Sequence, residues 1–143
     1  KGGAVYLLQS DYFSNNDKFI NNSAKYGSDI FGKNSVINID NSTFTKNGAE
    51  INWSLIYGTF SDITINNCIF TDLTSKYATV VYNDHILRIK KSKFTDIFNL
   101  GLIDNISLKS LIALITIPFD NSANTCRSFA SSITKGGYKY LRV

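Results

Sequence analysis

The chain has 143 residues, which is enough for one compact domain and too few for two full hydrophobic cores. Hydrophobic residues make up 43% of the chain and charged residues 18%, which excludes a disordered acidic tail and a coiled coil. The net charge is +4, and the basic residues are scattered along the sequence. Even the densest basic stretch, residues 88–93, is interrupted by Ile89 and Ser92. Nucleic-acid-binding proteins usually gather basic residues on one face, so we expect no nucleic-acid partner.

The composition favours strands over helices. Met is absent and Glu occurs only at Glu50, whereas β-branched and aromatic residues are abundant. The longest apolar run, residues 111–117, is much shorter than the roughly 20 residues that a membrane-spanning helix needs, so we expect no membrane span in this piece. The chain begins at Lys1 without Met or an apolar leader, and we interpret it as part of a longer parent protein.

Phe recurs at intervals close to 25 residues along most of the chain. The five marker residues are Phe19, Phe44, Phe70, Phe94 and Phe119. Seven residues before the last four markers, an aliphatic pair begins at Ile37, Ile63, Leu87 and Ile112. A period of this length, with strand-like segments separated by turn residues, is typical of a chain that winds into a solenoid. We therefore predict about five coils over residues 1–119, followed by a tail, cap or partial coil over residues 120–143.

A second aromatic series lies between the markers. Phe31, Tyr57 and Tyr82 follow aliphatic residues in step, and we expect residues 102–105 to continue the series after a shorter interval. Each period is thus predicted to hold at least two strands, such as residues 36–44 and 54–57, separated by Gly, Asn, Asp and Ser. In neighbouring coils of such a solenoid, equivalent residues stack about 4.8 Å apart.

Small and amide side chains recur at fixed offsets from the marker Phe. Ser42, Cys68 and Ser92 stand two residues before it, which predicts an inward, inert thiol for Cys68. Cys68 and Cys126 lack C-x-x-C spacing, and we expect both to be unpaired, with a bridge between them as the alternative. Amides that we expect to stack along the axis lie three residues before or after a marker, at Asn22, Asn47, Asn41 and Asn67.

Several motifs resemble those of a known family. Residues 2–5 read Gly-Gly-Ala-Val, and Phe-x-x-Asn occurs at residues 13–16, 19–22 and 44–47. These motifs resemble the paired GGA-I/V/L and FxxN repeats of polymorphic outer membrane proteins, which are described as right-handed parallel β-helices of the pectin-lyase-like type. The resemblance implies an all-β parallel β-helix that serves as an extracellular stalk or adhesive surface. Beyond Phe70 the FxxN asparagine is lost, because Leu73 and Ile97 take its place.

The same fold also hosts pectate lyases and polygalacturonases, which need clustered carboxylates for acid–base catalysis or Ca²⁺ binding. Residues 88–90 match the Arg-Ile-Lys tripeptide of polygalacturonases, but the carboxylate and histidine motifs that accompany it there are missing. Asp72 and Asp96, each two residues after a marker, are the best carboxylate pair and the only candidates for a metal. Asp84, His85 and Asp104 form a looser group, which we interpret as surface residues. We therefore expect no catalytic residue and no cofactor.

The sequence thus predicts a structural or adhesive β-helix segment of a larger cell-surface or secreted protein. Its partners would be surface glycans or proteins, contacted by ladders of Tyr, Asn and Lys on a flat face. The alternative is a carbohydrate-active lyase or hydrolase domain, decayed or with its catalytic coils elsewhere in the parent chain. A third possibility is a degenerate fragment without a function of its own.

Overall fold

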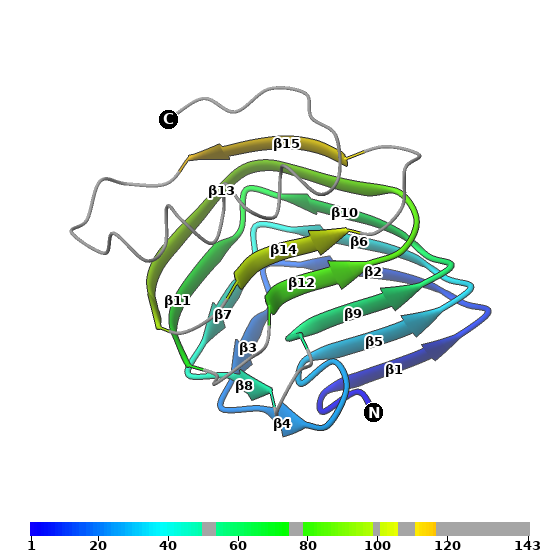
Figure 1. Cartoon of the computed structure of the whole chain (residues 1–143), viewed down its shortest axis with the longest axis horizontal. Helices are drawn as coiled ribbons and strands as arrows, with labels where there is room; N and C mark the ends of the chain where they lie inside the picture. The colour runs from blue at the N-terminus through cyan, green and yellow to red at the C-terminus, as the bar shows by residue number, and fades with distance from the viewer. Residues whose placement is uncertain (50–53, 75–78, 99–100, 106–110, 117–143) are drawn as a thin grey trace.

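A computed structural model describes residues 1–49, 54–74, 79–98, 101–105 and 111–116. These residues form strands and corners without any helix, and the strands are stacked in parallel as a β-solenoid (Figure 1). This confirms the all-β class and the parallel solenoid, whereas the right-handed sense of the winding stays a prediction. The strands are β1 (Val5–Leu8), β2 (Asp11–Asn15), β3 (Lys18–Ile20), β4 (Ser23–Ala24), β5 (Ile30–Lys33), β6 (Val36–Asp40), β7 (Thr43–Thr45), β8 (Gly48–Ala49), β9 (Ile56–Thr59), β10 (Asp62–Asn66), β11 (Ile69–Thr74), β12 (Thr79–Asn83), β13 (Leu87–Phe98), β14 (Gly101–Asn105) and β15 (Leu111–Thr116).

Successive coils contribute one strand each to the same sheet. The first sheet has the order β1-β5-β9-β12-β14, and the second has the order β2-β6-β10-β13-β11-β7-β3, with β15 paired to β13. A small third sheet joins β4 and β8. The first coil is thus β1–β4, the second β5–β8, the third β9–β11 and the fourth β12–β13.

The number of turns differs from the prediction. The structure forms about three turns rather than five. Within the described residues, β1–β11 make three passes around the solenoid, and the strands that follow belong to coils that are described only in part. The fifth marker, Phe119, lies outside the described residues, as does the predicted tail over residues 120–143.

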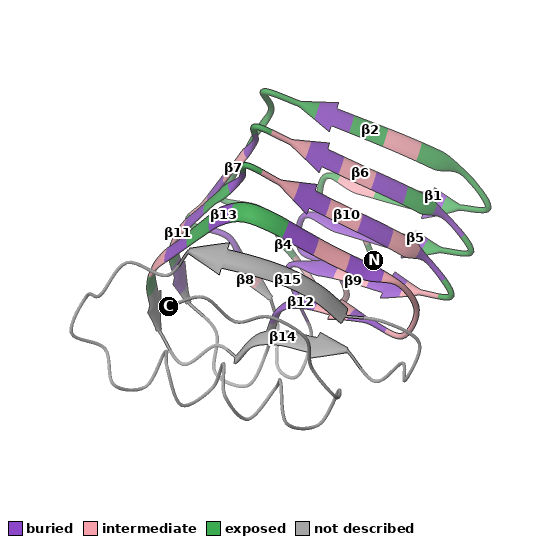
Figure 2. Ribbon diagram, turned by 90° about the horizontal axis from the view of Figure 1, so that it is seen from above, coloured by how far each residue is buried: buried purple, intermediate pink, exposed green. Residues whose placement is uncertain are grey.

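The interior is built from side chains of like kind in register. The rings of Phe19, Phe44, Phe70 and Phe94 are stacked face to face, with centroids 4.5, 4.5 and 4.7 Å apart. Buried and outward-facing positions alternate along the strands of the second sheet, as Figure 2 shows for β6 and β10. Full burial of each such apolar side chain is worth about 1.5–3 kcal/mol. The four stacked Phe rings thus form a continuous part of the buried core along the solenoid axis.

The corners of the solenoid are set by residues in the left-handed backbone region. Among the residues that the structure describes, eleven other than glycine have positive φ, and all of them fall into three columns that run along the solenoid. The register of the adjoining strands gives these columns as Gln9, Asn34 and Phe60; Asn16, Asn41, Asn67 and Lys91; and Asn21, Lys46, Asp72 and Asp96. The single strand predicted over residues 36–44 is therefore wrong, because Asn41 (φ 50°) turns the chain between β6 and β7.

The register of the last strands was predicted only in part. Val81 pairs with Ile103 and Asn83 with Asn105, so residues 102–105 do continue the second aromatic series as the sequence indicates. The predicted equivalence of Leu87 and Ile112 is wrong by one residue, because Leu87 pairs with Leu111. Since side chains alternate between faces, a shift of one residue reverses which positions of a strand point inward. The pairing of β13 with β15 also shifts between Lys90 and Ser92.

Candidate functional site

Hydroxyl groups hold the corners together, and Cys68 takes the place of one of them. The main-chain N–H of Cys68 donates to Ser92 Oγ at 3.1 Å, and that of Asp17 donates to Ser42 Oγ at 3.2 Å. Cys68 Sγ donates to the Asn66 carbonyl oxygen two residues earlier at 3.2 Å, as the Ser92 hydroxyl does to Lys90. Burial raises the pKa of the Cys68 thiol, while hydrogen bonding with the Ser42 and Asn66 main chain opposes the rise. Cys68 is a free, buried thiol with a structural role, and Cys126 lies outside the described residues.

The predicted asparagines fall into two different arrangements. Asn47 is buried and binds the main chain of the first coil: its Oδ1 accepts the Asn22 N–H and its Nδ2 donates to the Phe19 carbonyl oxygen, both at 2.8 Å. Asn41 and Asn67, in contrast, belong to an exposed amide ladder. Asn67 Nδ2 donates to Asn41 Oδ1 at 2.7 Å, and Asn41 Nδ2 donates to Asn15 Oδ1 at 3.0 Å. The Asn22–Asn47 pair therefore differs from the expected amide-to-amide stacking.

Asp72 and Asp96 lie at equivalent corners of successive coils. Both are exposed and have positive φ, and the Asp72 carbonyl oxygen accepts the Lys46 N–H at 3.1 Å. Among the described residues no three His, Cys, Asp or Glu side chains are grouped so as to hold a metal ion. The pair is thus accounted for by the turn, since Asp is one of the residues that tolerate the left-handed conformation.

The Arg-Ile-Lys tripeptide lies on β13 in the second sheet. Ile89 is buried in the core, so Arg88 and Lys90 point to the opposite face. Their register partners on β10 are Thr64 and Asn66, so the neighbouring strand supplies no carboxylate beside them. Tyr82 and Asp104 are in register, but the side chain of Asp104 lies outside what the structure describes.

The corner between β12 and β13 is one residue shorter than the equivalent corner of the third coil. Strand pairing places Asn83 opposite Gly58 and Leu87 opposite Ile63. Three residues separate Asn83 from Leu87 in the fourth coil, whereas four residues separate Gly58 from Ile63 in the third. We call residues 84–86, together with Phe60 and Asp62 of the preceding coil, the short corner. Asn83 Nδ2 donates to the Ile86 carbonyl oxygen at 2.8 Å and so bridges the shortened turn.

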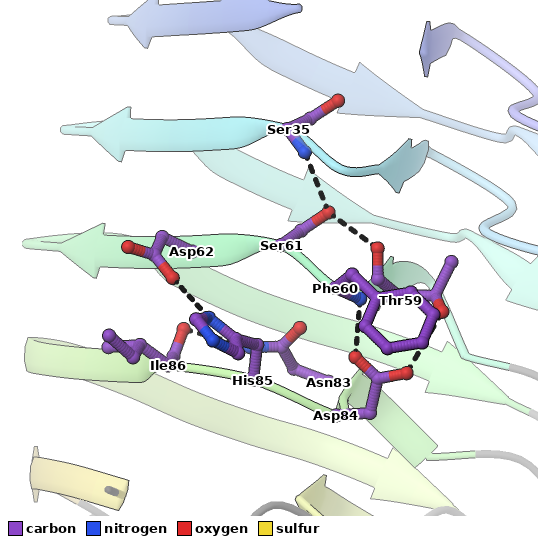
Figure 3. A network of polar contacts seen from close by, with 9 residues as sticks. All are labelled: Ser35, Thr59, Phe60, Ser61, Asp62, Asn83, Asp84, His85 and Ile86. Carbon is purple, nitrogen blue, oxygen red and sulfur yellow. Dashed lines mark hydrogen bonds and ion pairs between the residues drawn. The ribbon is translucent and has the colours of Figure 1, made fainter. Parts of the chain in front are cut away.

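The carboxylate of Asp84 compensates for the missing residue. In the first two coils, the N–H of the left-handed residue donates to a main-chain carbonyl of the next coil, for example from Asn34 to Thr59 at 3.0 Å. In the third coil, the N–H of Phe60 donates to Asp84 Oδ1 instead, and Thr59 Oγ1 donates to Asp84 Oδ2 at 2.9 Å (Figure 3). A side-chain oxygen thus replaces a main-chain oxygen.

An imidazole and a carboxylate meet at the same corner. His85 Nδ1 lies 2.6 Å from Asp62 Oδ1, and both side chains are 38% exposed (Figure 3). Ser61 lies nearby, but its hydroxyl donates to the Thr59 carbonyl oxygen at 3.0 Å and accepts the Ser35 N–H at 3.1 Å. With both roles of its hydroxyl in use, Ser61 does not form a nucleophile–His–Asp arrangement with this pair.

Sequence reasoning identified Asp84 and His85 but missed Phe60 and Asp62. The signal that could have found them is the marker spacing, which falls from 26 residues to 24 between the intervals that end at Phe70 and Phe94. One of the two lost residues falls at this corner, because Gly58 and Asn83 are 25 residues apart in sequence and Ile63 and Leu87 are 24 apart.

A column of aromatic side chains lies on the outer face of the first sheet, and we call it the aromatic column. It consists of Tyr6, Phe31, Tyr57 and Tyr82, whose successive ring centroids are 5.3, 5.5 and 4.5 Å apart with nearly parallel planes. The residues before the last three, Ile30, Ile56 and Val81, are fully buried in the core. The alternation of the strand therefore directs the aromatic rings away from the core.

Lysines and a further tyrosine flank this column. Lys1 Nζ lies 5.2 Å from the centre of the Phe31 ring, and Lys25 Nζ lies 5.8 Å from that of Tyr26. The Tyr26 ring meets Tyr57 edge to face at a centroid distance of 5.9 Å. Burial is the largest influence on the Tyr57 hydroxyl and raises its pKa, while a hydrogen bond with Tyr82 lowers it. Phe31 is only 3% exposed, Tyr57 and Tyr82 are half-buried and Tyr6 is 51% exposed, so the column is packed along its length and open to solvent mainly at Tyr6.

Neither a protein-family model, nor a curated protein, nor a solved structure matches this chain. The likeness of its GGA and FxxN motifs to polymorphic outer membrane protein repeats therefore has no support beyond the parallel solenoid itself. Within the described residues, no helix has the length and apolar character that crossing a membrane requires.

Proposed function

We propose that this chain is a structural and adhesive solenoid segment of a larger cell-surface or secreted protein, and that its aromatic column contacts glycan or protein partners. The observation that carries the proposal is the outward stack of Tyr6, Phe31, Tyr57 and Tyr82 on the first sheet. Tyr6 is 51% exposed, Tyr57 and Tyr82 are half-buried and Phe31 is buried, so a partner can reach the edges of the three tyrosines.

The solenoid gives such a column two useful properties. Its rings are held in place by their neighbours, so little side-chain entropy remains to be lost when a partner binds. Tyr combines a large apolar ring with a hydroxyl, and for this reason it is enriched at protein interfaces and in antibody binding sites. Because the rings stack face to face, a partner meets mainly their edges and hydroxyl groups.

The column can be tested by substitution of one member. The full chain is passed over immobilised cellulose, chitin, mannan and polygalacturonate, and its retention is measured for the wild type, Tyr57→Ser and Phe13→Ser. Phe13 is 74% exposed on β2 in the second sheet and serves as the matched control. We expect retention on at least one polysaccharide, reduced by Tyr57→Ser and unchanged by Phe13→Ser. Equal retention of all three proteins, or none on any surface, would contradict the proposal.

The alternative is a carbohydrate-active lyase or hydrolase domain, intact or decayed. It rests on the occurrence of pectate-degrading enzymes among proteins of this fold type, and no contact among the described residues favours it. Incubation with polygalacturonate and Ca²⁺ tests it directly, since a lyase would release unsaturated products that absorb in the ultraviolet. We expect no product to form.

A further inference from the structure

The short corner presents an aromatic ring in an unusual conformation. Phe60 is 66% exposed and has φ of 50°, whereas the equivalent position in the second coil is occupied by Asn34. Bulky residues in the left-handed region are true outliers and are held there at a cost of about 1–2 kcal/mol. Asn would fill the position with less strain, so the corner itself does not require an aromatic residue.

The backbone beneath this ring is held firmly. The Phe60 N–H donates to Asp84 Oδ1, and the Ser61 hydroxyl links the Thr59 carbonyl oxygen to the Ser35 N–H in the second coil. The exposed ring therefore projects from a corner that is fixed on both sides (Figure 3). Strain that is maintained by surrounding hydrogen bonds is typical of positions with a function.

Polar groups suited to hydroxyl recognition lie on the same corner. His85 Nδ1 and Asp62 Oδ1 use one another as partners. No hydrogen bond to His85 Nε2 or Asp62 Oδ2 is present among the residues that the structure describes. Both side chains are 38% exposed, so these two atoms can still bind a ligand. A carboxylate oxygen accepts from a hydroxyl group, and an imidazole nitrogen can donate to one.

We propose that the short corner binds a neutral pyranose unit of a glycan, with Phe60 against the apolar face of the sugar ring and the Asp62–His85 pair on its hydroxyl groups. The inference rests on the proposed adhesive function and names the class of ligand. Neutral sugars are favoured over uronates because this corner holds two carboxylates, Asp62 beside His85 and Asp84 beneath Phe60, and only one imidazole, so a third carboxylate would be repelled.

The short corner is continuous with the aromatic column. Tyr57 lies three residues before Phe60, at about 3.3 Å per residue of strand, and β9 ends at Thr59 between them. In the fourth coil, Tyr82 precedes Asp84 and His85 in the same way. An oligosaccharide seated on Phe60 can therefore extend toward the hydroxyl groups of the column.

The decisive variant is Phe60→Asn, which installs the residue found at the same corner of the second coil. The full chain is titrated calorimetrically with cellohexaose, a neutral β-1,4-linked glucose hexasaccharide. Because Asn adopts positive φ readily, the variant should unfold at an equal or higher temperature, while its affinity falls by about tenfold or more. The matched control is Phe13→Asn, which mirrors Asn38, the register partner of Phe13, and should leave the affinity unchanged.

Two further arms test the polar contacts and the charge. Asp62→Asn and His85→Gln should each weaken cellohexaose binding about three- to tenfold, and hexagalacturonate should bind more weakly than cellohexaose. The inference is overturned if hexagalacturonate binds as tightly, or if Phe60→Asn binds like the wild type. It is also overturned if cellohexaose does not bind while Tyr57→Ser still abolishes retention on another polysaccharide, and that last outcome leaves the proposed adhesive function intact.

Discussion

Asp84 Oδ1 accepts the main-chain N–H of Phe60, a bond that a main-chain carbonyl oxygen makes at the equivalent corners of the first two coils. The fourth coil has one residue fewer at this corner, and the Phe60 N–H donates to the Asp84 side chain rather than to a main-chain carbonyl. A carboxylate side chain can reach the same place, which lets the repeat lose a residue while the strands on either side keep their register.

Removal of this carboxylate should destabilise the fold. Asp84→Ala leaves the Phe60 N–H and the Thr59 hydroxyl without their acceptor, and we expect the free energy of unfolding to fall by about 1–3 kcal/mol. Asp84→Asn keeps one acceptor oxygen and should cost less. Urea denaturation measures both, and Asp11→Ala on the exposed start of β2 serves as the control. A loss no larger for Asp84→Ala than for Asp11→Ala would show that the carboxylate does not replace the carbonyl.

Asn47 should be the most sensitive of the predicted asparagines. Asn47→Ala leaves the Asn22 N–H and the Phe19 carbonyl oxygen unpaired at a buried corner, with an expected loss of about 1–3 kcal/mol for each buried group. Asn38→Ala, in a half-buried outward position of β6, should change stability by less than about 0.5 kcal/mol. Chemical denaturation of the two variants gives the comparison. Similar losses in both would mean that the Asn47 contacts contribute little.

Cys68 should tolerate Ser better than an apolar residue of similar size. Ser42 and Ser92 occupy the same column, so Cys68→Ser should preserve the corner hydrogen bonds and unfold within about 1 kcal/mol of the wild type. Cys68→Val removes the sulfur that bonds with the Ser42 and Asn66 main chain and should cost about 1–3 kcal/mol more than Ser. Thermal unfolding in a Cys126→Ser background separates the two. If the Cys68→Val variant is more stable than the Cys68→Ser variant, packing contributes more than hydrogen bonding at this position.

Asp29 is predicted to make stability depend on pH. The side chain is fully buried, Asn22 Nδ2 donates to its Oδ1 at 2.8 Å, and its Oδ2 has no partner among the described residues. Burial raises the pKa of Asp29 to about 7, against the smaller opposing effect of the Asn22 hydrogen bond. The folded state therefore holds this proton more tightly than the unfolded state does, so the contribution of Asp29 to stability is greatest below about pH 4 and is lost as the pH rises to about 7.

The variant Asp29→Asn isolates this effect. Asn keeps an acceptor for Asn22 and cannot ionise, so it should gain stability relative to the wild type as the pH rises, by up to about 4 kcal/mol across the window. Unfolding by urea is measured for both proteins from pH 4 to pH 8, and the difference between them removes the contribution of other titrating groups. A difference that does not change with pH would mean that Asp29 ionises normally in the folded chain.

Some parts of this fold were predictable from residue spacing and others were not. The spacing of Phe44 and Phe70 predicts that their rings lie at the same position of successive coils, and their centroids are 4.5 Å apart. The different contacts of Asn47 and Asn41 could not be predicted, because both lie three residues from a Phe and only the corner geometry turns one inward and the other outward. The pairing of Asp62 with His85 was also hidden, since it depends on a corner that is one residue short.

The sequence by itself determined that this chain repeats and that like residues stack, because a strand that recurs at a constant interval can bury its apolar face only against its own copies. Only the tertiary structure decided where the chain turns and what the turns present. Phe60 occupies a left-handed position that its own conformational preferences oppose, and it does so because hydrogen bonds to Asp84 in the fourth coil and from Ser35 in the second hold this corner. Contacts between coils outweigh local propensity at the corners, and for that reason the candidate site lies where the sequence pattern is least informative.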